Sequence, residues 1–208
     1  MNFRVRNTTK DMAARLAEIQ RACFPTLSEK QLITEQHFSA HVDLFPEGQH
    51  AVLTDDGLVV ASSTDIRYNI NFNHIEHRYM DVSGNNWLKS HDPNGEWLYG
   101  IDIGVHPDWR GHRLSSLLYT ARKNLAQELG LRGHVAGGML KGYHAHKDKL
   151  SVEAYVDKVV AGELFDPVLS VQLRQGFSVA GIIQDYLDDP SCDNKAALIV
   201  WHNPEFRE

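Results

Sequence analysis

Residues 97–129, WLYGIDIGVHPDWRGHRLSSLLYTARKNLAQEL, contain a change of hydrophobic period that predicts a strand, a turn and a helix. The strand runs from Leu98 to Val105, and its apolar residues alternate onto one face, at Ile101, Ile103 and Val105. Pro107 ends the strand because it has no N–H to donate to a sheet. From there the period changes to three and four residues, which predicts one helix face: Leu114, Leu117, Leu118, Ala121, Leu125 and Leu129.

The turn between this strand and helix, Trp109–Arg113, has features of an anion site. Unpaired N–H groups and the positive end of the helix dipole point at one spot, where Arg110 and Arg113 add full charges. Gly111 permits a positive φ or a close backbone approach, and Ser115 or Ser116 can cap the helix. A phosphate or pyrophosphate is the natural occupant. The alternative is a solvated connection with two surface arginines.

The sequence VHPDWRG followed by an amphipathic helix resembles the acetyl-CoA-binding motif of the GNAT superfamily of N-acetyltransferases. The resemblance implies that acetyl-CoA is the cofactor and that backbone amides of the loop hold its pyrophosphate. It further implies pantetheine contacts from Ile103, Gly104 and Val105, and a diphosphate site formed by Arg110, Gly111, His112, Arg113, Leu114, Ser115 and Ser116. Two positions depart from the family pattern, because Arg113 replaces a Gly and Ser115 replaces a Gly or Ala. Arg113 is then expected to need a right-handed backbone or a changed loop.

Composition predicts one globular domain over residues 1–208. The chain has 42% hydrophobic and 23% charged residues, which are globular values. Its formal charge of −6 argues against a general nucleic-acid binder. Cys23 and Cys192 stand in unrelated contexts, which suggests a reducing compartment. We expect no membrane association and a cytoplasmic protein, because neither a secretory signal nor an apolar run of about 20 residues is visible.

The order of elements in the first half is predicted as strand, helix, helix, strand, strand. A strand covers Asn2 to Asn7, and Thr8 or Thr9 caps the helix that follows. A second helix opens at Ser28-Glu29; its His37 and His41 lie one turn apart and could bind a metal, although a hydrogen-bonded pair is favoured. Strands at Gln49–Thr54 and Leu58–Ile70 flank Asp55-Asp56-Gly57, a hairpin signal. This order matches the GNAT fold, an α/β (α+β) architecture with a mixed sheet of about seven strands flanked by helices.

The second half contains an irregular segment, a glycine-rich strand and a last helix. Asn71–Glu96 is interpreted as a substrate-side lid or a mobile excursion. In the strand HVAGGM, Gly137-Gly138 allow a close approach, and the resemblance implies that pantetheine enters a gap beside it. Further predictions are a helix capped by Ser151, another in DPVLSVQLRQGF with Asp166 as cap, and two closing strands. YGIDIGVHPDWRG, VAGGMLKGY, YVDKVVAGEL and DPVLSVQLRQGF resemble GNAT domains found with carbon–nitrogen hydrolase domains.

The resemblance implies attack of an amine on the thioester of acetyl-CoA, which needs a base, an oxyanion donor and an acid. The oxyanion donor is expected to be the N–H of Val105, or of Gly104 at a strand bulge. Candidate bases are Asp102 and Tyr99, followed by His144 or His146. The family's usual acid is a Tyr at the position of Gln172, so the candidate acids here are Tyr143 and Tyr186.

Two functions therefore compete. The first is an N-acetyltransferase that acts on a small-molecule or peptide amine in a ternary complex, with a homodimer as one option for its assembly. The second is a GNAT-fold module that binds an acyl-CoA without turnover, as a sensor or a partner subunit. No metal site is expected, because the twelve histidines are scattered without ligand spacing.

Overall fold

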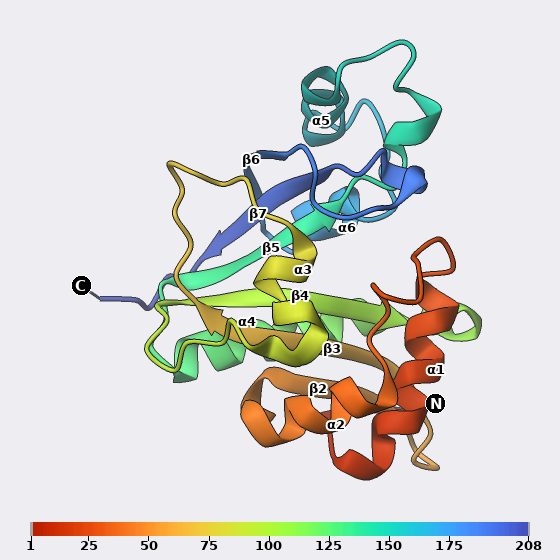
Figure 1. Ribbon diagram of the computed structural model, residues 1–208, viewed down its shortest axis with the longest axis vertical. Helices are drawn as coiled ribbons and strands as arrows, with labels where there is room; N and C mark the ends of the chain where they lie inside the picture. The colour runs from red at the N-terminus through yellow and green to blue at the C-terminus, as the bar shows by residue number, and fades with distance from the viewer. Residues whose placement is uncertain (1, 208) are drawn as a thin grey trace.

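A seven-stranded sheet runs through the centre of the protein in the order β1-β2-β3-β4-β5-β7-β6 (Figure 1). The computed structural model describes residues 2–207. Neighbouring strands are antiparallel except β4 and β5, which are parallel. The predicted mixed sheet is therefore confirmed. Its strands are β1 (Phe3–Asn7), β2 (Gln49–Thr54), β3 (Val59–Tyr68), β4 (Trp97–Val105), β5 (Gly133–Met139), β6 (Ser178–Ile183) and β7 (Ala196–His202).

Helices cover both faces of the sheet. In Figure 1, α1 (Ala13–Cys23) and α2 (Glu35–Leu44) lie in front of the sheet and α4 (Leu114–Glu128) lies behind it. The remaining α-helices are α3 (Tyr79–Val82), α5 (Val152–Val160) and α6 (Leu169–Arg174). Shorter turns of helix are η1 (Lys10–Met12), η2 (Pro46–Gly48), η3 (Gly84–Leu88), η4 (Pro107–Trp109), η5 (Tyr143–Ala145) and η6 (Pro190–Cys192). Within residues 2–207 no helix is long and apolar enough to cross a bilayer.

The second helix begins later than the sequence predicts. α2 starts after Thr34, whose hydroxyl and amide exchange hydrogen bonds with His37 in a capping box, so the predicted start at Ser28-Glu29 is wrong. His41 is buried, and its Nε2 lies 2.6 Å from the carbonyl oxygen of Asn86. The two histidines therefore have separate partners. Among the described residues, no group of three His, Cys, Asp or Glu side chains could hold a metal.

α4 buries an arginine that its leucine pattern did not predict. Arg122 is only 1% exposed, and its Nε donates to Asp65 Oδ2 at 3.0 Å. His134 Nε2 lies 3.0 Å from the other oxygen of Asp65. Leu117, which was predicted to lie on the buried face, is instead exposed. Because an unpaired buried charge is costly, this buried ion group fixes α4 against β3 and β5.

β4 contains a one-residue bulge at Ile101. Thr64 of β3 pairs with Asp102, whereas Asp65 pairs with Gly100, so Ile101 is the extra residue. Beyond the bulge the strand reverses its facing, because side chains alternate with a period of two. The glycines show this reversal: a Cβ at Gly100 would meet Arg122 and His134, whereas a Cβ at Gly104 would meet Cys23 of α1.

The bulge corrects two predictions and creates one new neighbourhood. The expected bulge at Gly104 is wrong, and Ile101 does not share a single face with Val105, which packs near Leu114 and Leu118. The reversal also brings Asp102 onto the same face of β4 as Tyr99. An uninterrupted strand would have placed these two side chains on opposite faces.

β4 and β5 pair only along their first halves. Trp97–Gly100 pairs with Gly133–Ala136, and beyond these residues the two strands separate. The amide of His106 donates to Val60 on β3. Because successive amides alternate along a strand, the N–H groups of Ile103 and Val105 face away from β3, toward the opening.

Candidate functional site

A cavity of about 750 Å³ lies where β4 and β5 separate. Its walls come from the bulged part of β4, the end of β5, the loop before α4 and the helix α6. Two stretches of the walls are continuous in sequence, Gly100–Ile103 and Gly137–Met139. The predicted loop residues Arg110, Gly111 and Arg113–Ser116 line the same cavity.

The loop before α4 presents open backbone amides. Residues 110–113 are exposed, and Gly111 has a φ of +86°. Arg113 is the N-cap of α4 and adopts φ 59° and ψ 26°, a left-handed conformation. The expectation that Arg113 needs a right-handed backbone or a changed loop is therefore wrong. The amides of residues 111–115 have no protein acceptor within the described part of the chain.

The two serines of α4 do not cap the helix, contrary to the prediction. No side chain caps α4 at its first residue. Ser116 Oγ instead accepts a hydrogen bond from Gln175 Nε2 at 3.0 Å, which ties the loop to the end of α6. The amides that a serine would have satisfied therefore stay available to a ligand.

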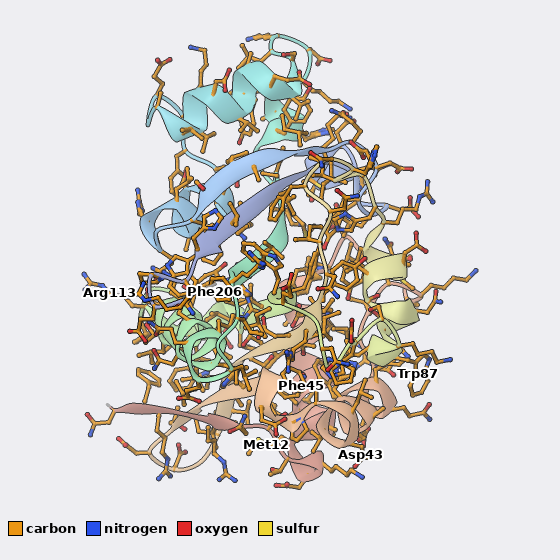
Figure 2. The ribbon with its side chains drawn as sticks, turned by 90° about the vertical axis from the view of Figure 1, so that its left-hand side faces the viewer. Met12, Asp43, Phe45, Trp87, Arg113 and Phe206 are labelled. Atoms are coloured by element: carbon orange, nitrogen blue, oxygen red, sulfur yellow. The ribbon has the colours of Figure 1, made fainter. Side chains whose placement is uncertain are left out.

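Three arginines surround this end of the cavity. Arg110 and Arg113 come from the loop, and Arg174 comes from the last turn of α6. Figure 2 shows Arg113 at the outer edge of the molecule. The sequence did not identify Arg174, because nothing in its local pattern distinguishes it from a surface helix residue. Open amides beside guanidinium groups form a site suited to a phosphate group.

Two of the predicted cofactor residues do not line the cavity. The ring of His112 packs against Phe3, with ring centroids 5.7 Å apart, and against Trp109. Gly104 faces α1, where Cys23 Sγ would lie 3.1 Å from an added Cβ. Their neighbours Ile103 and Val105 do line it.

Asp102 is the buried acidic side chain of the cavity wall. It is 8% exposed, and its Oδ2 has no hydrogen-bond partner. Burial raises the pKa of Asp102 to about 7; Arg122 opposes this rise, and the nearby Asp65 carboxylate adds to it. A carboxylate with this pKa can take up a proton near neutral pH and release it again.

The predicted tyrosines divide into one at the cavity, one behind it and one elsewhere. Tyr186 lines the cavity, and Tyr99 lies behind it with the two hydroxyl oxygens 3.2 Å apart. Tyr143 does not line the cavity; its hydroxyl donates to Leu150. His144 and His146 are also outside the lining.

The two glycines of β5 accommodate side chains of the protein itself. A Cβ on Gly137 would lie 2.3 Å from Tyr186 Cζ, and one on Gly138 would lie 2.3 Å from Gln172 Oε1. Gln172 is 4% exposed, and its Oε1 has no partner although the residue lines the cavity. The position expected for a tyrosine acid therefore presents a buried oxygen that can only accept a hydrogen bond.

Comparisons with known proteins agree with this architecture. No family profile matches the chain. It is 30% identical over 203 residues to the probable hydrolase YhcX of Bacillus subtilis, covering 97% of this chain but only 39% of that protein. It is 29% identical over 205 residues to the uncharacterized N-acetyltransferase YkwB of the same organism, covering 98% of this chain and 90% of YkwB. The match to a hydrolase fits the resemblance to GNAT domains found with hydrolase domains.

Solved structures show the same fold. The GNAT-like decarboxylase GphF in complex with isobutyryl-CoA superposes with a TM-score of 0.78 at 22% identity, covering 96% of this chain and 98% of GphF. YncA of Salmonella typhimurium, a putative acetyltransferase with its cofactor acetyl-CoA, has a TM-score of 0.60 at 12% identity, covering 99% of this chain and 96% of yncA. The chain therefore has the GNAT-like acyl-CoA N-acyltransferase fold.

Proposed function

We propose that this protein binds acetyl-CoA in the cavity between β4 and β5 and transfers the acetyl group to an amine of a small molecule or peptide. The observation that carries the proposal is the run of open amides at residues 111–115, which lies at the end of a cavity with a buried carboxylate inside it. The complexes of GphF and yncA, which hold acyl-CoA molecules, support it.

The loop would hold the diphosphate of the acyl donor. Gly111 and Arg113 already have the left-handed backbone that turns successive amides toward one anion. Arg110, Arg113 and Arg174 would add charge at the same end. The thioester is the chemistry that this group supplies, and the gap between the strands is where its pantetheine arm would run.

Val105 is the proposed oxyanion donor. The amides of Ile103 and Val105 both face the opening, but the Ile103 amide is engaged by the Asp102 carboxylate. Val105 N–H therefore remains available to a carbonyl oxygen on which negative charge develops. Asp102 is the proposed base: it takes a proton from the ammonium group of the acceptor, and the neutral amine can then attack.

The first experiment measures binding and turnover with defined probes. Acetyl-CoA and CoA should each raise the melting temperature, because they bind only the folded state; at a concentration of 100 Kd the gain is about 2.7 kcal/mol. Release of free CoA is then followed with a panel of primary amines and amino-terminal peptides. Failure of both ligands to shift melting at millimolar concentration would refute the proposal. Binding without CoA release for any amine would favour the non-catalytic binding module.

A second candidate is decarboxylation of an acyl-CoA whose acyl group carries a carboxylate. The specific observation in its favour is the TM-score of 0.78 with GphF, a GNAT-like decarboxylase, against 0.60 with yncA. Incubation with malonyl-CoA, followed by mass spectrometry for acetyl-CoA, tests it. Conversion without an amine would replace the transferase proposal, and unchanged malonyl-CoA would exclude this candidate.

A further inference from the structure

Three side chains form a hydrogen-bonded chain that leads from the cavity wall toward solvent. Tyr186 lines the cavity, and its hydroxyl oxygen lies 3.2 Å from that of Tyr99. Tyr99 is fully buried, and its hydroxyl oxygen lies 2.6 Å from His77 Nε2. His77 is partly exposed. The chain thus joins a cavity residue, a core residue and a surface residue from three separate segments.

The direction of this chain depends on the charge of His77. Its Nδ1 lies 2.6 Å from the carbonyl oxygen of Ile75, which can only accept, so Nδ1 carries a hydrogen. The proton that His77 gains or loses is therefore the one on Nε2. When Nε2 is bare, Tyr99 donates to it and Tyr186 donates to Tyr99. When Nε2 is protonated, both hydroxyls can reverse, and the Tyr186 O–H then points into the cavity.

The backbone fixes Tyr186 from both sides. Its amide donates to the Asn194 carbonyl at 2.8 Å, and its own carbonyl accepts from the Tyr79 amide at 2.7 Å. Its ring occupies the space above Gly137 that a side chain on β5 would need. Tyr79 opens α3 only two residues after His77, so the same contact holds both ends of the chain.

We propose that Tyr186 protonates the thiolate that leaves when the thioester C–S bond breaks, and that His77 restores this proton through Tyr99. This proposal rests on the function proposed above. The sulfur takes the phenol proton of Tyr186, Tyr186 takes the proton of Tyr99, and Tyr99 takes the Nε2 proton of His77. His77 then takes a proton from water, so no charge remains in the cavity.

The charges around the chain suit this role. Burial raises the pKa of Tyr186 to about 12, so the phenol keeps its proton until a strong base forms beside it. Burial lowers the pKa of His77, while the Ile75 carbonyl and the carboxylates of Glu76 and Asp81 act in the opposite direction. The Tyr99 and Tyr186 rings pack edge-on against the imidazole. Gln172 Oε1, at the position expected for an acid, cannot supply a proton.

The first test measures the thiol pKa of CoA bound to the protein, from the ultraviolet absorbance of the thiolate. A phenol that donates to sulfur stabilises the thiolate, so Tyr186→Phe should raise the pKa of the bound thiol by about one unit. Tyr143→Phe is the matched control, because it also removes a buried hydroxyl but lies outside the cavity, and it should leave this pKa unchanged. This measurement needs no acceptor amine.

The second test measures turnover with the amine that gives the fastest CoA release. Tyr186→Phe should lower kcat about 100-fold, the lower end for general acid catalysis, with little change in KM for acetyl-CoA. Tyr99→Phe and His77→Asn keep Tyr186 but interrupt its proton supply, so kcat should fall about tenfold. Added imidazole should partly restore His77→Asn, because His77 reaches solvent, and should not restore Tyr99→Phe.

The outcomes separate this proposal from the one on which it rests. If Tyr186→Phe binds acetyl-CoA like the parent and also keeps the parent's bound-thiol pKa and kcat, the relay is refuted while the transferase stands. A parent protein that does not bind CoA refutes the proposed function itself. Equal losses in Tyr143→Phe and Tyr186→Phe would show a general effect of removing buried hydroxyls and would also overturn the relay.

Discussion

The cavity has two sides that are built in different ways. The loop side consists of residues 103–116, a continuous strand, loop and helix start whose main chain supplies the binding groups. The opposite side, which we call the tyrosine side, collects His77, Tyr99, Gln172 and Tyr186 from four separate segments, and there only side chains act. The difference shows that a site formed by local backbone can be predicted from spacing. A site formed by distant side chains requires the tertiary structure.

The largest expected effect tests the loop side with two glycines. Gly111→Val should weaken acetyl-CoA binding by at least about 100-fold, because a β-branched residue cannot hold the φ of +86° that aims the loop amides. Gly57→Val is the matched control. Gly57 has a φ of +89° in a hairpin far from the loop and nothing near its Cα, so the variant meets similar strain. Calorimetric titration should show loss of binding in Gly111→Val alone; equal affinity in both would refute the diphosphate assignment.

Asp102 lies where the two sides meet, and Asp102→Asn should lower kcat/KM about 100-fold. In the parent, activity should rise with pH through about 7, because only the ionised carboxylate accepts a proton. Asp102→Asn should lose this limb of the pH profile while it still binds acetyl-CoA. A variant that keeps both the rate and the limb would exclude Asp102 as the base.

The same pKa has a consequence for stability. The folded-state pKa of Asp102 lies above its usual value of 3.8, so between about pH 4 and 7 the folded state holds a proton that the unfolded state has lost. This contribution to stability therefore declines as pH rises through that window. Urea unfolding at pH 5 and pH 8 should show a smaller decline in Asp102→Asn than in the parent.

The tyrosine side is tested by Gly137→Ala. The new Cβ would lie 2.3 Å from Tyr186 Cζ, so the ring must move, at a cost of about 1–3 kcal/mol in unfolding free energy. We expect reduced kcat and an unaltered loop. In a Tyr186→Ala background the same substitution should cost much less, because the clash is gone. Additive losses in a double-mutant cycle would contradict the packing of Tyr186 on Gly137.

The smallest effect concerns long-range charge on the loop side. Arg110→Glu should weaken acetyl-CoA binding about tenfold at low salt, and the difference from the parent should shrink as ionic strength rises. Arg4→Glu reverses an exposed charge on β1 and should leave affinity unchanged at each salt concentration. A salt-independent loss in Arg110→Glu would point to a steric cause.

The predicted elements differ in how well the structure supports them. The strand, loop and helix of residues 97–129 were predicted correctly because each has its own hydrophobic period and a proline or glycine boundary. The start of α2 was predicted wrongly because Ser28-Glu29 and Thr34 are both acceptable caps, and only packing selects between them. Ile101 and Arg122 were misplaced because a bulge and a buried ion pair leave no periodic signal.

The sequence by itself determined the order of strands and helices, the position of the anion-binding loop and the identity of Asp102 as a candidate base. These follow from local periods, turn residues and charge, which act over a few neighbouring residues. Only the tertiary structure decided that Asp102 and Tyr99 share a face, that Tyr143 is remote and that His77 connects to the cavity. The reason is geometric, because a single extra residue in β4 reverses the facing of every side chain beyond it.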